Sequence, residues 1–126
     1  MSKYTAMETN IFSIFDSSEW KSNNIATYPA NYTSRSNVTE FIRISIIPSG
    51  ESLNINSLSG IILIDIFTKK GYGLRTTWEI ADQLDLFLVG KKINETQLFK
   101  SNVRLSTDDD YNRAIYQISF KHFGVK

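Results

Sequence analysis

Apolar residues recur along the chain with two different periods, which predict where helices and strands lie. Near the N-terminus they follow one another at steps of three and four, so we expect a helix that ends near Asp16 or Ser17. Its apolar face consists of Tyr4, Met7, Ile11, Ile14 and Phe15. The next stretch, 17–37, is rich in Ser, Asn and Thr and contains Pro29, which predicts a loop with a short extended piece at 25–28.

Four later segments have the alternation and β-branched composition of strands, and they fall into two pairs. The segment 41–47 alternates apolar and polar residues until Pro48 ends it, and 58–68 resumes after a polar stretch. That stretch is too short for a parallel crossover, so the two strands are expected to pair as a hairpin. The second pair is 96–105 with 113–123, separated by a tip that contains three consecutive Asp residues.

A second helix is predicted between the two hairpins. Residues 76–79 read Thr-Thr-Trp-Glu, which matches a capping box, and Gly90 followed by two lysines suits a helix C-terminus. Its apolar stripe consists of Trp78, Ala81, Leu84 and Leu88, with Ile80 and Phe87 beside them. The order of elements predicts an α+β fold in which residues 1–126 form a single domain, an antiparallel β-sheet of about four to five strands packed by two helices.

Composition and charge narrow the possible chemistry. A formal charge of +1 provides no broad positive field, which argues against dedicated DNA binding. Cysteine is absent and His122 is the single histidine, so disulfides, thiol nucleophiles and multi-His metal sites are excluded. These absences exclude most catalytic classes, and we expect no metal and no cofactor. Because the N-terminus is polar and no apolar run is long enough to span a bilayer, we also expect no membrane partner and synthesis as a cytosolic product.

Three motifs permit a functional interpretation, and each has a simpler structural one. Gly71-Tyr72-Gly73 precedes the second predicted helix, where a phosphate loop would lie, but the further residues of such loops are missing and a turn explains it better. The acidic tip at 108–110 lacks the spacing of a calcium loop and is more simply a solvated turn. His122 has no readable nucleophile or carboxylate partner, which favours a packed or surface histidine.

One strand, 58–67, is apolar on both faces, which a half-exposed antiparallel strand would not be. The two sets are Ile62, Ile64 and Ile66 on one side and Ile61, Leu63 and Phe67 on the other. The second helix can cover only one of these faces. The other face is covered either by the first helix or by a neighbouring subunit, and the residues do not separate these two possibilities.

Several motifs in the middle of the chain occur in an order found in a known family. They are F-I-R-I-S-I-I-P at 41–48, S-G-I-I-L-I-D-I-F at 59–67, G-Y-G at 71–73 and I-A-D-Q-L at 80–84. This pattern resembles the tail terminator family of long-tailed phages and prophages, over roughly residues 25–92. The resemblance implies a non-enzymatic virion protein that forms a ring, usually of six copies, on the head-proximal end of the tail tube.

The resemblance also implies partners and contact residues. The partners are other copies of the chain, the tail tube protein and a head completion or connector protein, with DNA passing through the ring and no sequence-specific DNA contact. Subunit-facing residues are expected at Ile61, Leu63 and Phe67. Contacts to the tube or neck are expected in the loop 49–57 and the acidic tip, at Ser49, Glu51, Asn54, Asn56, Asp108, Asp109 and Asp110.

Two rival functions remain open. One is another head–tail connector or neck protein with a similar sheet, which patterning of this kind does not separate from a terminator. The other belongs to a different class: a domain that binds a small ligand or nucleotide at the turn 71–73.

Overall fold

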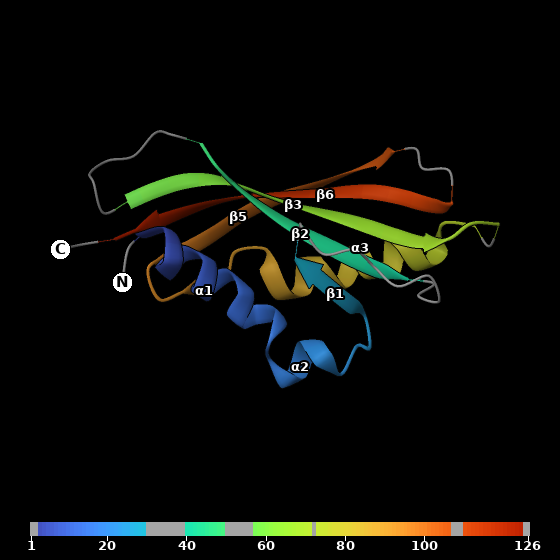
Figure 1. Cartoon of the computed structure of the whole chain (residues 1–126), viewed down its shortest axis with the longest axis horizontal. Coiled ribbons are helices and arrows are strands. Elements are labelled where there is room, and N and C mark those ends of the chain that lie inside the picture. The colour runs from blue at the N-terminus through green and yellow to red at the C-terminus, as the bar shows by residue number, and fades with distance from the viewer. Residues whose placement is uncertain (1–2, 30–39, 50–56, 72, 107–109, 125–126) are drawn as a thin grey trace.

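The fold is described from a computed structural model, which describes residues 3–29, 40–49, 57–71, 73–106 and 110–124. Along the described chain two helices are followed by three strands, one helix and three more strands (Figure 1). In order they are α1 (Lys3–Phe15), α2 (Ser18–Lys21), β1 (Ala26–Pro29), β2 (Phe41–Pro48), β3 (Ser57–Lys69), α3 (Arg75–Leu88), β4 (Lys92–Ile93), β5 (Thr96–Ser106) and β6 (Tyr111–Phe123).

Within the described residues, six strands form one sheet in the order β1-β2-β3-β6-β5-β4. β1 runs parallel to β2, and the other neighbouring pairs are antiparallel. The α+β class is confirmed. The predicted count of four to five strands is wrong because β1 and β4 add short edge strands, and the wholly antiparallel arrangement is wrong at β1. The short extended piece predicted at 25–28 overlaps β1, but four residues do not show that it joins the sheet. β4 has two residues, too few to show any periodicity.

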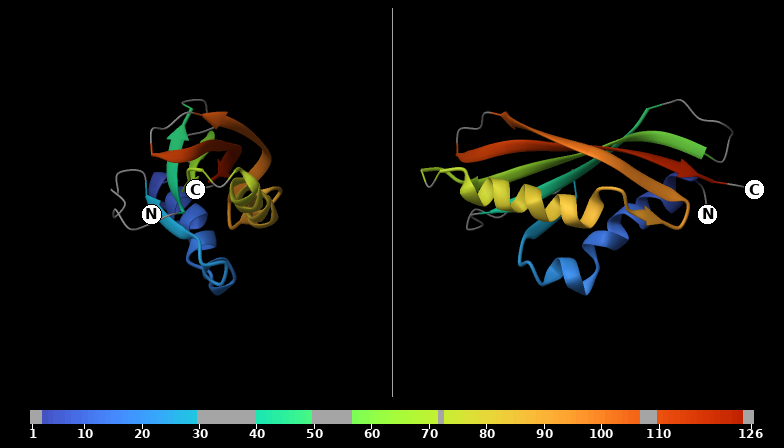
Figure 2. Two further views of the ribbon diagram at one scale, coloured as in Figure 1. Left: turned by 90° about the vertical axis from the view of Figure 1, so that its right-hand side faces the viewer. Right: turned by 180° about the vertical axis from the view of Figure 1, so that it is seen from behind.

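The described helices number three, where two were predicted, and all lie on the same face of the twisted sheet (Figures 1 and 2). The first predicted helix corresponds to α1. The additional helix is α2, a single turn whose N-cap residue Ser17 accepts a hydrogen bond on its Oγ from the Trp20 amide at 3.2 Å. This turn places the Trp20 side chain against α1 and α3, where it is 1% exposed.

The start of α3 differs from the predicted capping box. The helix begins at Arg75, its N-cap is Leu74, and no side chain caps it. Thr77 is instead buried, and its hydroxyl hydrogen-bonds that of Thr68 on β3 at 2.8 Å. Trp78, predicted to lie in the apolar stripe, is 44% exposed, and Ile80 takes its place in the core. The tertiary contact with β3 therefore decides the rotation of this helix, and the capping motif does not.

Both predicted hairpins are confirmed: β2 pairs with β3, and β5 pairs with β6. They join through β3 and β6, the two longest strands, which pair along their whole length at the centre of the sheet. Along both central strands alternate residues point toward the helices. That face of the sheet supplies Ile62, Ile64 and Ile66 from β3, and Ala114, Tyr116, Ile118 and Phe120 from β6.

Candidate functional site

The sheet has one face that no described helix covers, and we call it the open face (Figure 2). The sequence left open whether the first helix or a neighbouring subunit covers this side of β3. α1 contributes Met7, Ile11 and Phe15 to the same core as α3, so it packs on the helix side. The possibility that the first helix covers this face is therefore wrong. A neighbouring subunit stays a prediction.

An aliphatic patch occupies one part of the open face. It consists of Ile61 and Leu63 on β3, Ile47 on β2 and Ile115 on β6. Ile47 lies directly opposite Ile61 in the sheet and is 43% exposed, while the other three side chains are half-buried. The structure therefore places two of the three predicted subunit-facing residues together and adds two that the sequence analysis had not selected. The antiparallel register brings these four together, and no single strand contains this information.

The third predicted subunit-facing residue, Phe67, is already buried within its own chain. Its ring stacks on Phe41 with centroids 4.6 Å apart and meets the ring of Tyr111 edge to face at 5.8 Å. Phe67 is 3% exposed and lies outside the main core, so it belongs to a second small cluster on the open face. This leaves little of its surface for a neighbour.

Two arginines lie over this aromatic cluster and give the open face its charge. The guanidinium carbons of Arg43 and Arg113 lie 5.0 and 5.5 Å from the centre of the Phe67 ring. Arg113 forms an ion pair with Asp65 at 2.9 Å. Among the described residues, Arg43 Nε is buried and has no hydrogen-bond partner. Neither arginine was among the residues predicted from the sequence, although alternation along β2 and β6 places both opposite the core.

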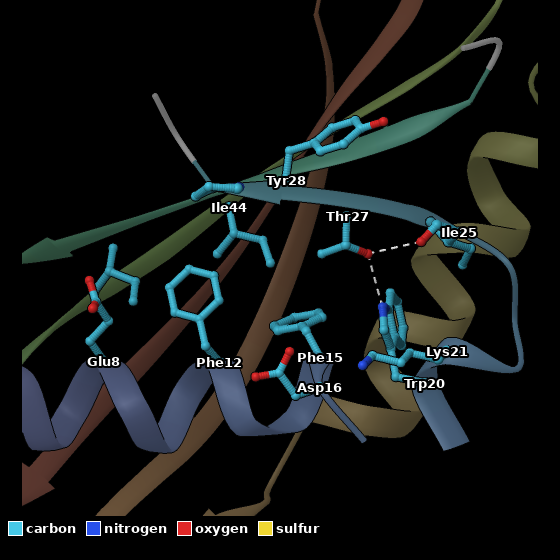
Figure 3. Close-up of a pocket in the computed structure, with 12 residues that line it drawn as sticks. Glu8, Phe12, Phe15, Asp16, Trp20, Lys21, Ile25, Thr27, Tyr28 and Ile44 are labelled. Carbon is cyan, nitrogen blue, oxygen red and sulfur yellow. Dashed lines mark hydrogen bonds between the residues drawn. The ribbon is translucent and has the colours of Figure 1, made fainter. Parts of the chain in front are cut away.

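A groove of about 800 Å³ lies between α1 and the strands β1 and β2 (Figure 3). Its lining includes the aromatic side chains of Phe12, Phe15 and Trp20, together with Ile44. The Trp20 indole donates to Thr27 Oγ1 at 3.0 Å, which holds α2 against β1. The lining also contains the carboxylates of Glu8 and Asp16 and the ammonium group of Lys21. This groove was not predictable from the sequence, because it forms only when α1 and β1 come together.

The predicted tube and neck contacts lie mostly outside the described residues. Glu51, Asn54, Asn56, Asp108 and Asp109 are not described. Of the remaining two, Ser49 follows β2 and its amide donates to the Ser59 carbonyl at 2.7 Å, while Asp110 is exposed just before β6. These two residues lie at opposite ends of β3, because Ser59 is near its start and Lys69, near its end, pairs with Tyr111.

The described residues of the other sequence motifs lie in turns or packed positions, and they are not brought together into one site. Gly71 and Gly73 have φ values of 94° and 77°, which glycine adopts without strain, and they form the exposed turn before α3. Across the described part of the chain, no cluster of three or more His, Asp or Glu side chains is close enough to hold a metal. The helices in those same residues are all too short or too polar to cross a bilayer.

His122 is packed in a buried polar chain that links α1 to the sheet. Asn94 donates to Asn10 Oδ1 at 3.0 Å, Asn10 donates to Thr96 Oγ1 at 3.0 Å, and Thr96 Oγ1 lies 2.9 Å from His122 Nδ1. When His122 Nδ1 carries no proton, it accepts a hydrogen bond from the Thr96 hydroxyl. Each residue of the chain then donates to the next one, from Asn94 to His122. Burial lowers the pKa of His122 below its ordinary value of 6.5, and the nearby Glu95 carboxylate opposes this shift.

This histidine predicts that stability falls in mild acid. Between pH 6.5 and the lower folded-state pKa, the unfolded chain binds the proton more readily than the folded chain. The free energy of unfolding is therefore expected to fall with decreasing pH, by at most about 1.4 kcal/mol per pH unit from this group. Urea unfolding at pH 7.5 and 5.5 measures the effect. The control is His122→Asn, whose side-chain amide can still hydrogen-bond Thr96 but does not titrate in this range. If the free energy of unfolding of this variant fell with pH as steeply as that of the native chain, His122 would not be the group responsible.

Comparisons with known proteins support the fold and leave the family open. The sequence matches no protein-family model and no curated protein. One solved structure, 9% identical in sequence, superposes over 98% of this chain and 96% of its own, with a TM-score of 0.67. At this level of identity the likeness shows a shared fold alone. The function must therefore be argued from the surfaces described above.

Proposed function

We propose that this protein is a structural assembly protein, a phage tail terminator. It would form a ring, usually of six copies, on the head-proximal end of the tail tube, stop tube polymerisation and present a surface to the head completion protein. The observation that carries the proposal is the aliphatic patch on the open face. All described helices pack on the opposite side, so a second chain is the natural cover for this patch.

The open face has the anatomy of a protein interface. A half-buried aliphatic centre is bordered by arginines and by Gln117, whose carboxamide oxygen accepts from Arg104 at 3.3 Å. Apolar centres with polar, arginine-rich rims are typical of subunit contacts. Completing the burial of each aliphatic side chain contributes about 1 kcal/mol, and several such contributions are needed to offset the entropy lost on association.

The positions of Ser49 and Asp110 support different partners at the two ends of the sheet. The stretch of β3 from Ser59 to Lys69 separates them, a rise of ten residues or roughly 33 Å. A ring subunit needs one surface for the tube below and another for the neck above, and these two ends suit that division. The proposal includes location in the virion after synthesis in the host cytoplasm, passage of DNA through the ring, and no catalysis or cofactor.

Sedimentation velocity over a concentration series tests the proposal. A species of six times 14.4 kDa is expected for the native chain. Leu63→Asp should give a folded monomer, because a charge at the centre of the patch opposes burial by a second chain. The matched control is Leu105→Asp, at a leucine that is 53% exposed on β5 outside the patch, which should assemble like the native chain. A Leu63→Asp chain that is folded and still oligomeric would refute the interface.

The groove between α1 and β1 favours a second candidate function, binding of a small apolar ligand. Two carboxylates, those of Glu8 and Asp16, outnumber the ammonium group of Lys21 in its lining, which disfavours nucleotide phosphates there and suits a neutral or cationic compound. Gly71 and Gly73 do not line this groove, so the turn that suggested a nucleotide site is not part of it. A thermal shift with aromatic amines would support this function, and a flat response would remove it. A chain that is monomeric at every concentration would also favour it.

A further inference from the structure

The two arginines on the open face reach the same place from opposite sides of β3. Arg43 stands on β2 and Arg113 on β6, and β3 lies between these strands and supplies Phe67. Both guanidinium groups lie over the Phe67 ring, with their central carbons 5.0 and 5.5 Å from its centre. Two cations held at one ring repel each other, so an anion beside both of them would be stabilised.

The positive charge at this place is only partly balanced within the described chain. The Asp65 carboxylate forms its ion pair with Arg113, at 2.9 Å. Arg43 lies directly opposite Asp65 in the sheet but forms no ion pair with it. Glu40 and Asp110, the exposed residues just before β2 and β6, form no ion pair with either arginine. One positive charge is therefore left over, on the half-buried Arg43.

Hydrogen-bond donors are also left over at this place. The Nε atoms of both Arg43 and Arg113 are buried, and neither has a hydrogen-bond partner in the described part of the chain. A buried donor without an acceptor is unfavourable, and native proteins rarely keep one unless a water or an ion completes it. Two such donors on neighbouring cations indicate that an anionic acceptor belongs here.

The geometry of the donors favours a phosphate group over a carboxylate. A guanidinium is a planar fork that bonds two oxygens side by side. Two forks that approach from opposite sides can be filled by the three or more oxygens of a phosphate, whereas a carboxylate has two oxygens. The strands place further charged side chains on the open face, and all of them are positive: Lys69, Lys92, Arg104 and Lys121.

We propose that Arg43 and Arg113 bind a phosphate group on the open face, beside the Phe67 ring. Arg43 supplies the unbalanced charge and the fork that no described residue occupies. Asp65 positions Arg113 through its ion pair and leaves the Arg113 Nε free for the ligand. The inference goes beyond the proposed function, since phosphate binding and ring assembly can each occur without the other.

Isothermal titration calorimetry with inorganic phosphate, at an ionic strength held constant with chloride, tests this site. The native chain should bind phosphate saturably, with a Kd in the millimolar range. Arg43→Gln removes one fork and should weaken binding about tenfold or more. Arg43→Lys keeps the charge without the fork, so its affinity should lie between these two. The matched control is Arg75→Gln, which removes a 92% exposed arginine on α3 and should bind like the native chain.

Several results would overturn the proposal. The site is wrong if the native chain shows no saturable binding, or if Arg43→Gln binds phosphate as tightly as the native chain. Equal losses in Arg43→Gln and Arg75→Gln would indicate general charge attraction instead. Acetate should bind more weakly than phosphate, and equal affinities would contradict a site for three or more oxygens. Should Arg43→Gln fail to fold by circular dichroism, Arg43→Lys takes its place.

Glycerol phosphate in the same titration distinguishes two sources of the phosphate group. Tighter binding than that of inorganic phosphate would assign the site to a phosphate ester, and weaker binding would assign it to the free ion. Sedimentation velocity of Arg43→Gln keeps this inference separate from the proposed function. Assembly without phosphate binding in this variant would show that the two properties use different parts of the open face.

Discussion

Replacing Trp20 with alanine is expected to lower the free energy of unfolding by about 3–5 kcal/mol. The Trp20 ring meets Phe15 and Phe87 edge to face at 5.1 and 5.2 Å, so it joins α1, α2 and α3. Its removal leaves a cavity among the helices and frees the Thr27 hydroxyl from its indole partner. Urea denaturation followed by far-UV circular dichroism measures the loss.

Trp78→Ala is the matched control, because the chain's other tryptophan is 44% exposed. Measured at a concentration low enough to keep the chain monomeric, this change should cost less than about 1 kcal/mol. Equal losses in the two variants would contradict the burial of Trp20. Trp20→Phe separates the contribution of ring packing from that of the hydrogen bond, since it keeps a ring in the core and removes the hydrogen bond to Thr27.

Gly60→Ala is expected to destabilise the protein by about 2–3 kcal/mol, because its new methyl group would collide with backbone. A Cβ atom at this position would lie 2.3 Å from the Ile47 carbonyl oxygen and 2.8 Å from the Pro48 Cα. Neither atom belongs to a flexible side chain, so β2 must shift away from β3. That shift would also displace Ile47 from the aliphatic patch.

The control for this prediction is Gly73→Ala, where a Cβ would meet no atom within 4 Å among the described residues but φ is +77°. Only backbone strain is expected there, about 1 kcal/mol. Thermal and urea unfolding measure the loss of stability in each variant, and so compare the cost of a steric collision with the cost of backbone strain. If Gly60→Ala were no worse than Gly73→Ala, the close approach of β2 and β3 would be wrong.

The elements with long periodic patterns were predictable from the sequence. The helix face of Met7, Ile11 and Phe15 and the alternation along β3 and β6 each repeat several times, so they indicate both the type of element and its buried side. The hairpins followed from the short polar stretches between strands. The two-sided apolar pattern of β3 also predicts a cover for its second face, and no described helix lies on that face.

The errors arose where a local motif competed with tertiary packing. Residues 76–79 match a capping box, yet Thr77 bonds to Thr68 on β3 and turns Trp78 outward. Thr68 lies nine residues before Thr77, outside the four residues of the motif, so the motif alone does not include the deciding contact. The orientation of Phe67 toward a neighbour stays a prediction, although stacking on Phe41 covers most of its ring within the chain.

By itself the sequence determined the α+β class, the paired hairpins and the apolar sides of the long elements, because these depend on periods that repeat within a segment. Only the tertiary structure decided that α1 shares a face with α3, that Ile47 and Ile115 join Ile61 and Leu63, and that Leu86 is left outside. These features depend on strand register and helix rotation. Both are set by packing between segments far apart in the chain, so the candidate interface emerges only when the chain is folded.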